Sequence, residues 1–493
     1  MKEYFLEIFK INPKEINELY GIRAIGCYIV IAYHCFTSSL GFLPKYFQNY
    51  KAGVQNFEML MDLFFVISSF LISYSFTNEL SKFGFLKSWK NFFLKRSFRI
   101  FPPLYVLVGF TIVLMSLTIQ AAKQGINLGI MADGIPAMQS RLNNWWVDAF
   151  YISNYFTDRL HIHGWSLSME EQFYIAMPLF IFLYAKYLKT KFGKILTLVL
   201  LLFLPILIRT YYYFYVPIEN SEDYLYKVFH PIHTHFDSFL AGILLMEIIK
   251  IDKQTLAKYI NPTKFFIVFL LTLALYICSF GFTYEENRFY FVVFRITNFT
   301  MLAFLITYGT IQGYFRYIRK LLSNVLIVCF GKLSYGIYLI HMYVSAVVMI
   351  KIFDYVNFDN NGIYEIFMAS IFSLLVSFLI ALISYYIIEK PFIKVREWTQ
   401  PKFNLTTQSF YFIESHPTEK KIVCFLITFL SFIPAYFMKL FLKSEFIPKN
   451  EVSSFIQIGL FLIPLLLNIY TLTKFRRLFI TIWLEKRITK TNF

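Results

Sequence analysis

One apolar stretch, GIRAIGCYIVIAYH, carries two ionisable side chains, Arg23 and His34. Their separation of 11 positions is about three turns of an α-helix, so the two side chains share one face, roughly 16 Å apart along the axis. The ordinary pKa of imidazole lies near neutrality, which suits it to take a proton from a hydroxyl group. Charged and titratable groups within an apolar span usually face a cavity or a partner. A snorkelling arginine and a hydrogen-bonded interior histidine are the alternatives.

Two carboxylates could accompany His34. Asp62 begins the apolar segment DLFFVISSFLIS, where a helix N-cap or first-turn acid is the alternative. Glu170 lies in HGWSLSMEEQFYIAMPL, in which Trp165, Glu170 and Tyr174 follow a helical rhythm from the membrane interface inward. An interfacial aromatic belt with a chance acid is the alternative there. Because a carboxylate orients an imidazole and stabilises its cation, we expect Glu170 or Asp62 to orient His34.

A basic segment, KRSFRIFPPLYV, contains Arg96 and Arg99 at a spacing of i, i+3. In a helix this spacing puts both guanidinium groups on one side, where they suit a phosphate or pyrophosphate. A positively charged membrane anchor is the alternative. Pro102 and Pro103 follow directly and are expected to break this helix or start the next one.

Further histidines occur later in the chain. His233, His235 and Asp237 could bind a metal, but no other ligands follow at a suitable spacing, so we predict no metal site. His341 lies inside an apolar segment, GKLSYGIYLIHMY, where a structural histidine is the alternative to a functional one.

The elements that carry these residues are too apolar for a soluble protein. Of 493 residues, 57% are hydrophobic and 16% are charged, whereas soluble domains have about 25% charge. Apolar segments suited to membrane helices fall at roughly 22–38, 60–77, 101–118, 169–187, 195–216, 235–249, 264–281, 292–311, 328–350, 364–388, 422–441 and 455–473. The shortest of them, 235–249, is the weakest. We therefore predict an all-α, polytopic membrane helix bundle with a ten-span core and two additional C-terminal spans.

The basic residues are distributed unevenly between the two sets of connections. The net charge is +17, and 33 of the 47 Lys and Arg residues lie in one alternate set, against 12 in the other. This asymmetry predicts that both termini are cytoplasmic and that the partner is the lipid bilayer rather than nucleic acid. We expect an interfacial helix in residues 1–20, the core in 21–392, a cytoplasmic linker in 393–420, and two spans with a basic tail in 421–493, which could carry dimer contacts.

Six segments, in the same order, resemble the membrane acyltransferase family 3, integral membrane enzymes that acylate carbohydrates. The matching segments are Arg-x10-His at 23–34, FFVISSFLI at 64–72, Arg-x-x-Arg before Ile-x-Pro at 96–102, WSLSMEEQFY at 165–174, SYGIYLIH at 334–341 and EKPF at 389–392. Two departures occur. Ser69 replaces a usual glycine, which implies a slightly wider helix contact, and His235 replaces a common arginine, which leaves the role of Asp237 open.

The resemblance implies transfer of an acyl group, usually acetyl, from cytoplasmic acyl-CoA to a hydroxyl of a surface glycan or glycolipid, such as lipopolysaccharide O-antigen. The reaction would end at the outer face of a bacterial inner membrane. It assigns acyl-CoA binding to Arg23, Arg96 and Arg99, and general base catalysis to His34 with Glu170 or Asp62. Acceptor contacts or structural support fall to the remaining motif residues, Trp165, Tyr174, Asp237 and His341.

Acetyl-CoA would be a donor substrate rather than a bound cofactor. Direct transfer is favoured over an acyl-enzyme, because no activated Ser or Cys motif occurs, although a transient acyl-histidine stays open. A glycolipid transporter or polymerase that does not depend on acyl-CoA is the alternative function, and a non-catalytic membrane scaffold is a third.

Overall fold

The described residues form helices joined by irregular segments. The computed structural model describes residues 7–395 except 14, 40–53, 55, 127–133, 252–259 and 356–361. These residues belong to one compact unit that spans residues 1–400, and no β-strand occurs among them. The predicted all-α fold is confirmed.

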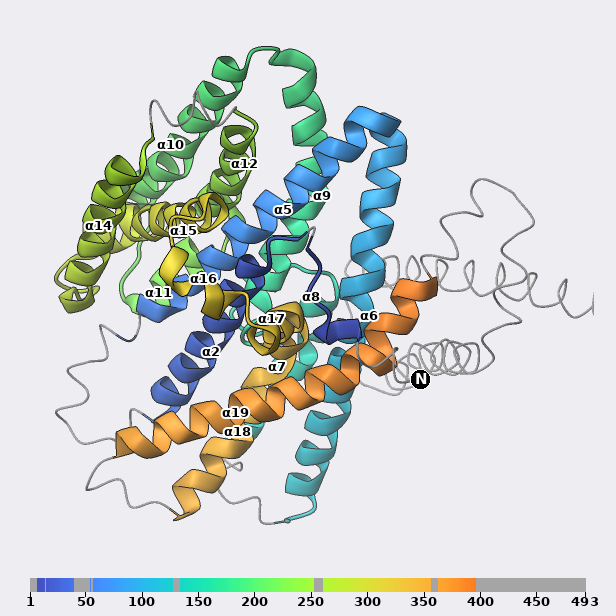
Figure 1. The fold of residues 1–493 in the computed structure, drawn as a ribbon. Helices are drawn as coiled ribbons and strands as arrows, with labels where there is room; N and C mark the ends of the chain where they lie inside the picture. Colours follow the sequence, from blue (N-terminus) through green and yellow to red (C-terminus); the bar gives the residue numbers. More distant parts are fainter. Residues whose placement is uncertain are drawn as a thin grey trace, which may run out of the picture. The chain divides into compact units, whose positions relative to one another are not determined.

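Eight helical segments among these residues are long and apolar enough to cross a bilayer. Their principal helices are α2 (Asn17–Ser39), α5 (Leu60–Phe83), α6 (Phe85–Lys123), α10 (Lys191–Tyr215), α14 (Pro262–Cys278), α15 (Arg295–Gln312), α18 (Ser334–Tyr355) and α19 (Gly362–Ser384) (Figure 1). Each corresponds to one of the ten spans predicted before residue 392. The prediction of a polytopic membrane protein is confirmed.

The other two predicted spans form helices of a different character. The first, α9 (Gly164–Tyr187), has 24 residues but carries two acidic residues near its start. The second, α12 (Asp237–Ile249), has 13 residues, which at 1.5 Å per residue is about 20 Å and falls short of the roughly 30 Å hydrocarbon core. Every residue from Asp237 to Glu247 is buried, so α12 packs inside the bundle.

Short helices and helical turns build the connections. They are η1 (Glu7–Phe9), η2 (Asn56–Met59), α7 (Ile135–Asn143), α8 (Trp145–Ala149), η4 (Ser153–Tyr155), α11 (Ser221–Tyr224), η5 (Leu225–Phe229), η6 (Ile232–Thr234), η7 (Ser279–Gly281), η8 (Tyr290–Phe294), α16 (Arg316–Leu322), α17 (Val325–Lys332) and η9 (Tyr385–Glu389). Three of them, η5, η8 and η9, are π-helical turns, a geometry often found at functional sites.

The buried helix α12 packs against α5, α10 and α15 (Figure 1). Its contact with α5 depends on Gly242. A Cβ atom there would lie 2.6 Å from the Val66 carbonyl oxygen and 2.7 Å from the Phe70 backbone nitrogen. The absent side chain also leaves room for the hydroxyl of Ser69, which is fully buried. Ser69 stands on α5 where a glycine was expected from the resemblance, and Gly242 on α12 makes room for its hydroxyl.

A second group of helices places α2 between α17, α18 and α19, and Figure 1 shows α18 and α19 side by side. Cys27 Sγ lies 3.8 Å from the Ser334 carbonyl oxygen, and His34, two turns further along α2, contacts the ring of His341 on α18, with ring centroids 5.3 Å apart. The contacts advance together along both helices, so α2 and α18 run in the same direction.

Two predicted boundaries were wrong. Pro102 and Pro103 lie inside α6, which continues through them. Each proline removes one intrahelical N–H donor and its ring crowds the carbonyl group of the preceding turn, yet α6 continues through both. The span predicted at 328–350 is instead divided at Leu333, between α17 and α18. The Lys332 ammonium at this break donates to the carbonyl oxygens of Ile8 and Lys10, at 3.4 and 2.6 Å.

The N-terminal segment of the core contacts the segment near its C-terminal end. Within the predicted interfacial helix of residues 1–20, the described residues form one 3-10 turn, Glu7–Phe9, and the beginning of α2 at Asn17. Near the other end, Lys390 of the EKPF segment forms an ion pair of 2.5 Å with Glu7. The predicted linker beyond residue 395 and the two additional spans lie outside the described residues.

Candidate active site

Three arginines from two helices gather around Glu170. Arg23 lies near the beginning of α2, and Arg96 and Arg99 lie on α6. Arg23 interacts electrostatically with Arg99 and with the Glu170 carboxylate. Arg96 lies over the ring of Tyr174, 5.3 Å from its centroid. We call Arg23, Arg96 and Arg99 the arginine cluster.

The arginine cluster lacks contacting acceptors. All three guanidinium groups belong to half-buried residues, and within the described ranges none of them forms a hydrogen bond or an ion pair of 4.0 Å or less. Each guanidinium has five N–H donors and a charge that it cannot lose. Carboxylates lie within electrostatic reach, with Glu170 near Arg23, Glu171 near Arg96 and Glu389 near Arg99. Guanidinium groups that form no short ion pair with the described residues suit the binding of a phosphate.

Glu170 is held at the level of the arginine cluster. Its Oε1 accepts hydrogen bonds from the Ser68 hydroxyl of α5 and from the Tyr174 hydroxyl one turn along α9. The two hydroxyl oxygens also lie 2.8 Å apart. Among the described contacts, no hydrogen bond joins Glu170 to His34.

A line of polar side chains follows one face of α18. The Tyr335 hydroxyl donates to the Ile100 carbonyl of α6 at 2.6 Å, and Tyr335 also interacts electrostatically with Glu170. One turn later the Tyr338 hydroxyl lies 2.5 Å from Ser166 Oγ at the start of α9. His341 follows after three more residues. The helix therefore connects the level of the arginine cluster with that of His341.

Four histidines form a row at the far end of this line. Ring centroids lie 5.3 Å apart for His34 and His341, 5.2 Å for His341 and His163, and 5.8 Å for His163 and His161. His34 is half-buried, whereas the other three are buried. We call these four residues the histidine row. It begins at the partly accessible His34 and leads into the protein.

Backbone carbonyls fix the protonated ring nitrogen in two members of the row. His341 Nδ1 donates to the Tyr338 carbonyl at 2.6 Å, and His163 Nε2 donates to the Leu339 carbonyl at 3.2 Å. A carbonyl can only accept, so these nitrogens carry the hydrogen. The remaining nitrogens, Nε2 of His341 and Nδ1 of His163, are buried and have no hydrogen-bond partner in the described part of the chain. Burial and then the neighbouring His341 lower the pKa of His163 well below its usual value, which keeps its ring neutral.

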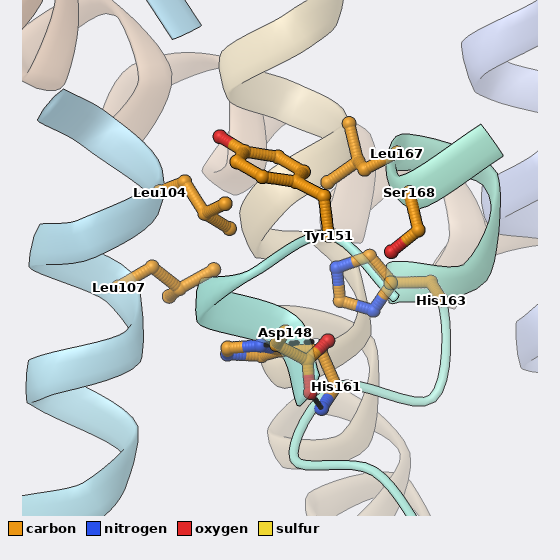
Figure 2. Close-up of a pocket in the computed structure, with 9 residues that line it drawn as sticks. Leu104, Leu107, Asp148, Tyr151, His161, His163, Leu167 and Ser168 are labelled. Atoms are coloured by element: carbon orange, nitrogen blue, oxygen red, sulfur yellow. Dashed lines mark hydrogen bonds and ion pairs between the residues drawn. The ribbon is translucent and has the colours of Figure 1, made fainter. Parts of the chain in front are cut away.

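A small pocket borders the buried end of the row. Figure 2 shows Leu104 and Leu107 of α6 on one side of it, with Asp148, His161 and His163 on the other. The Asp148 carboxylate accepts hydrogen bonds from the backbone N–H groups of Leu160 and His161, at 2.8 and 3.3 Å, and lies 3.7 Å from His161 Nδ1. The row therefore ends at a carboxylate.

The loop that carries His161 and His163 is fixed by its own contacts. The buried Arg159 guanidinium donates to the carbonyls of Ser153, Phe156 and Ile162, at 3.1, 3.2 and 2.9 Å. Gly164 begins α9 here, and a Cβ at this position would collide with the Asp148 carboxylate. These contacts hold the two histidines against α18.

Asp62, the other carboxylate expected beside His34, is engaged elsewhere. Its Oδ1 accepts hydrogen bonds from His235 Nε2, at 2.6 Å, and from the Ser238 hydroxyl. Burial opposes a charge on His235, but the Asp62 carboxylate outweighs it and raises the His235 pKa above its usual value. Asp237 forms a separate buried ion pair of 2.9 Å with Arg209. His235 lies between the Asp62 carboxylate and the Phe229 carbonyl, two acceptors that favour the protonated form of its ring.

The other expected site residues lie apart from the histidine row. Trp165 is buried and stacks on His230, with ring centroids 4.6 Å apart. His233 contacts Tyr155 and Tyr212, so it does not converge with His235 and Asp237. No group of three or more potential metal ligands occurs in the ranges that the structure describes.

Sequence reasoning missed His161, His163, Asp148 and Arg159. A signal was present, because His161 and His163 form a second His-x-His pair directly before the WSLS segment. Asp148 lies 13 residues before His161, beyond the reach of any local spacing rule. Only the fold brings it to the row.

The fold and this site define a multi-pass membrane protein with polar chemistry buried inside its helix bundle. A family model described as an acyltransferase domain matches residues 16–382, and the chain belongs to this family. The matched range includes the arginine cluster and the whole histidine row. The resemblance drawn from the six segments is confirmed.

Relatives cover most of the matched range. The chain is 28% identical over 406 residues, 78% of its length, to a Staphylococcus aureus (strain COL) protein named "Putative O-acetyltransferase". It is 28% identical over 183 residues, 36% of its length and 26% of the relative's, to "Peptidoglycan O-acetyltransferase OatA" of Listeria monocytogenes. The chain spans 59% of the length of the first relative. No solved structure matches it.

Proposed function

We propose that the protein transfers an acyl group, in the first instance acetyl, from acyl-CoA to a hydroxyl of a cell-envelope glycan or glycolipid. The observation that carries the proposal is the arginine cluster, three half-buried guanidinium groups that form no ion pair of 4.0 Å or less with a carboxylate of the described residues. CoA brings phosphate and pyrophosphate groups, which are the anions that paired guanidinium groups bind best. Acyl-CoA acts as a substrate in this account, and no resident cofactor is needed.

His34 is the general base. The acceptor hydroxyl oxygen attacks the thioester carbonyl carbon while its proton moves to the His34 imidazole. The C–S bond then breaks, and the leaving thiolate takes that proton, so CoA leaves as a thiol. The transfer is direct, with Glu170 kept at the arginine cluster and Asp62 paired with His235. Tyr335 and Tyr338 line α18 between the two levels.

The arginine cluster and His34 lie at different levels of the helix bundle, which suits a reaction that receives its two substrates from opposite sides of the membrane. The charge asymmetry of the connections assigns the start of α2, and with it the arginine cluster, to the cytoplasmic side of a bacterial inner membrane. Acyl-CoA would enter there, and the acceptor would reach His34 from the outer side. Lipopolysaccharide O-antigen is one acceptor of this class. The name of the Listeria relative favours peptidoglycan as another.

Membranes that contain the full-length protein test the proposal when they are given acetyl-CoA labelled in the acetyl group. We expect label in the glycan fraction only when the protein is present, and mass spectrometry of the peptidoglycan and lipopolysaccharide fractions identifies the acceptor by a gain of one acetyl unit. A transporter or polymerase would change the amount of glycan without transferring label, and that result would overturn the proposal.

A further inference from the structure

A histidine that acts as a base needs a group that fixes its ring. In most such sites a carboxylate does this by accepting the hydrogen of one ring nitrogen. Here Asp62 is bonded to His235 and Ser238, and Glu170 to Ser68 and Tyr174. The ring contacts of His34 are with two other residues. Tyr33 lies with its centroid 5.0 Å away, and His341 at 5.3 Å.

We propose that His341 is the positioning residue for His34 and takes the place of the usual carboxylate. The proposal rests on the function proposed above, in which His34 is the base. It also assigns a role to His163, which stands directly behind His341 in the histidine row.

The hydrogen bonds of His341 fit this role. Its Nδ1 hydrogen is tied to the Tyr338 carbonyl at 2.6 Å, so the lone pair is on Nε2. That nitrogen is buried and has no hydrogen-bond partner among the residues that the structure describes. A buried acceptor without a donor destabilises the folded protein, and such a group needs an explanation. An N–H of the adjacent His34 is the donor that it lacks.

The solvent exposure of the two rings determines which of them a substrate meets first. His34 is half-buried, whereas His341 is 1% exposed. A substrate therefore reaches His34 first, with His341 behind it. When one His34 nitrogen donates to His341, its other nitrogen keeps a lone pair for the acceptor hydroxyl. The rings are in contact without a hydrogen bond here, and catalytic hydrogen bonds commonly tighten only in the substrate complex.

His163 extends the arrangement. Its Nδ1 is a second buried lone pair without a partner, and its ring lies 5.2 Å from that of His341. Two neutral acceptors can stabilise the His34 cation as it forms, without placing a permanent negative charge in the bundle. Within the described residues, these histidines do not form a group that could hold a metal ion.

Two substitutions of His341 separate positioning from structure. In His341→Asn the side-chain amide can still donate to the Tyr338 carbonyl, as Nδ1 does, but the acceptor at the Nε2 position is gone. In His341→Gln the amide oxygen can occupy that position, but the bond to the carbonyl is lost. A structural role predicts that Asn is the better replacement. A positioning role predicts that Gln is.

Transfer of labelled acetyl from acetyl-CoA, measured in membranes with equal amounts of folded protein, decides between them. We expect kcat to fall at least about 30-fold in His341→Asn and about threefold or less in His341→Gln. The KM for acetyl-CoA should stay constant in both, because His341 lies away from the arginine cluster. Equal losses in both variants, or a more active His341→Asn, would overturn the proposal.

A second measurement does not depend on activity. In detergent-solubilised full-length protein labelled with ¹⁵N-histidine, the signals of His34 are identified by their loss in His34→Gln. His341→Asn should shift these signals and His341→Gln should largely retain them. His34 signals that are unchanged in both variants would refute the contact. If the wild type transfers no label, the proposed function fails, while this spectrum still tests the positioning.

Discussion

At the scale of residues, the three guanidinium groups of the arginine cluster form no hydrogen bond and no ion pair of 4.0 Å or less with any described residue. Replacing both Arg96 and Arg99 by Gln removes two guanidinium forks without removing Arg23. A charge-assisted hydrogen bond contributes about 1.5–3 kcal/mol, so we expect the Kd for acetyl-CoA to rise at least about tenfold. Equilibrium binding of labelled acetyl-CoA in detergent measures this change.

Lys87→Gln is the matched control, because it removes a charge from the same helix. Lys87 is exposed and lies over the Phe83 ring, 4.8 Å from its centroid. This variant should bind acetyl-CoA as the wild type does. Binding that is equally weak in both, or unchanged in the double variant, would mean that the arginine cluster does not hold the donor.

The pair of His235 and Asp62 should make stability depend on pH. Burial opposes the charge on His235, but Asp62 raises its pKa above the usual value. The folded state then binds this proton more tightly than the unfolded state, so the stabilisation is complete below about pH 6.5 and is lost as pH rises through the folded pKa. We expect the melting temperature in detergent to exceed that of His235→Gln most at low pH, with a gap that narrows toward pH 9.

His233→Gln serves as the comparison, since His233 is less buried and contacts tyrosines rather than a carboxylate. The difference in melting temperature between the wild type and His233→Gln should not narrow as the pH rises toward 9. A gap between the wild type and His235→Gln that widens with rising pH contradicts a protonated His235.

The residues of the site were predictable where a single segment carries the information. Arg96 and Arg99 share a helix face because of their spacing, and Arg99 interacts electrostatically with Arg23. Partners across the fold were not predictable in this way. The carboxylate expected at His34 turned out to belong to His235, because α5 meets the segment before α12. The roles assigned to these residues stay predictions.

At the scale of elements, the contact between α5 and α12 depends on one missing side chain. Gly242→Ala would bring a Cβ within 2.6 Å of the Val66 carbonyl oxygen. Overpacking of this kind costs about 1–3 kcal/mol, so we expect a lower melting temperature in detergent. Gly281→Ala is the control, because a Cβ there meets nothing within 4 Å. Equal melting temperatures for the two variants would show that α5 and α12 can move apart without loss of stability.

Hydropathy predicted where the helices are, and it failed where local contacts decide how they end. The ten expected spans before residue 392 all contain helix. It could not predict that α6 continues through Pro102 and Pro103, because tolerance of a proline depends on the surrounding packing. Nor could it predict the break at Leu333, where Lys332 caps carbonyls of the N-terminal segment.

At the scale of the whole molecule, the charge asymmetry predicts which connections face the cytoplasm. Lys189 lies in the connection between α9 and α10, and Glu219 in the one after α10, and both are exposed. In a background with Cys278→Ser and Cys424→Ser, a membrane-impermeant maleimide should label Glu219→Cys in intact cells. It should label Lys189→Cys only after the membrane is made permeable. The reverse pattern would invert the proposed orientation and separate the arginine cluster from cytoplasmic acyl-CoA.

The whole account depends on His34 as the group that takes the acceptor proton. The most direct measurement is transfer of labelled acetyl from acetyl-CoA by His34→Gln, made alongside acetyl-CoA binding by the same protein. The account predicts that binding stays within about twofold of the wild type while transfer falls at least about 100-fold, the loss typical of a missing general base. Transfer at the wild-type rate by a His34→Gln protein that still binds acetyl-CoA would contradict it.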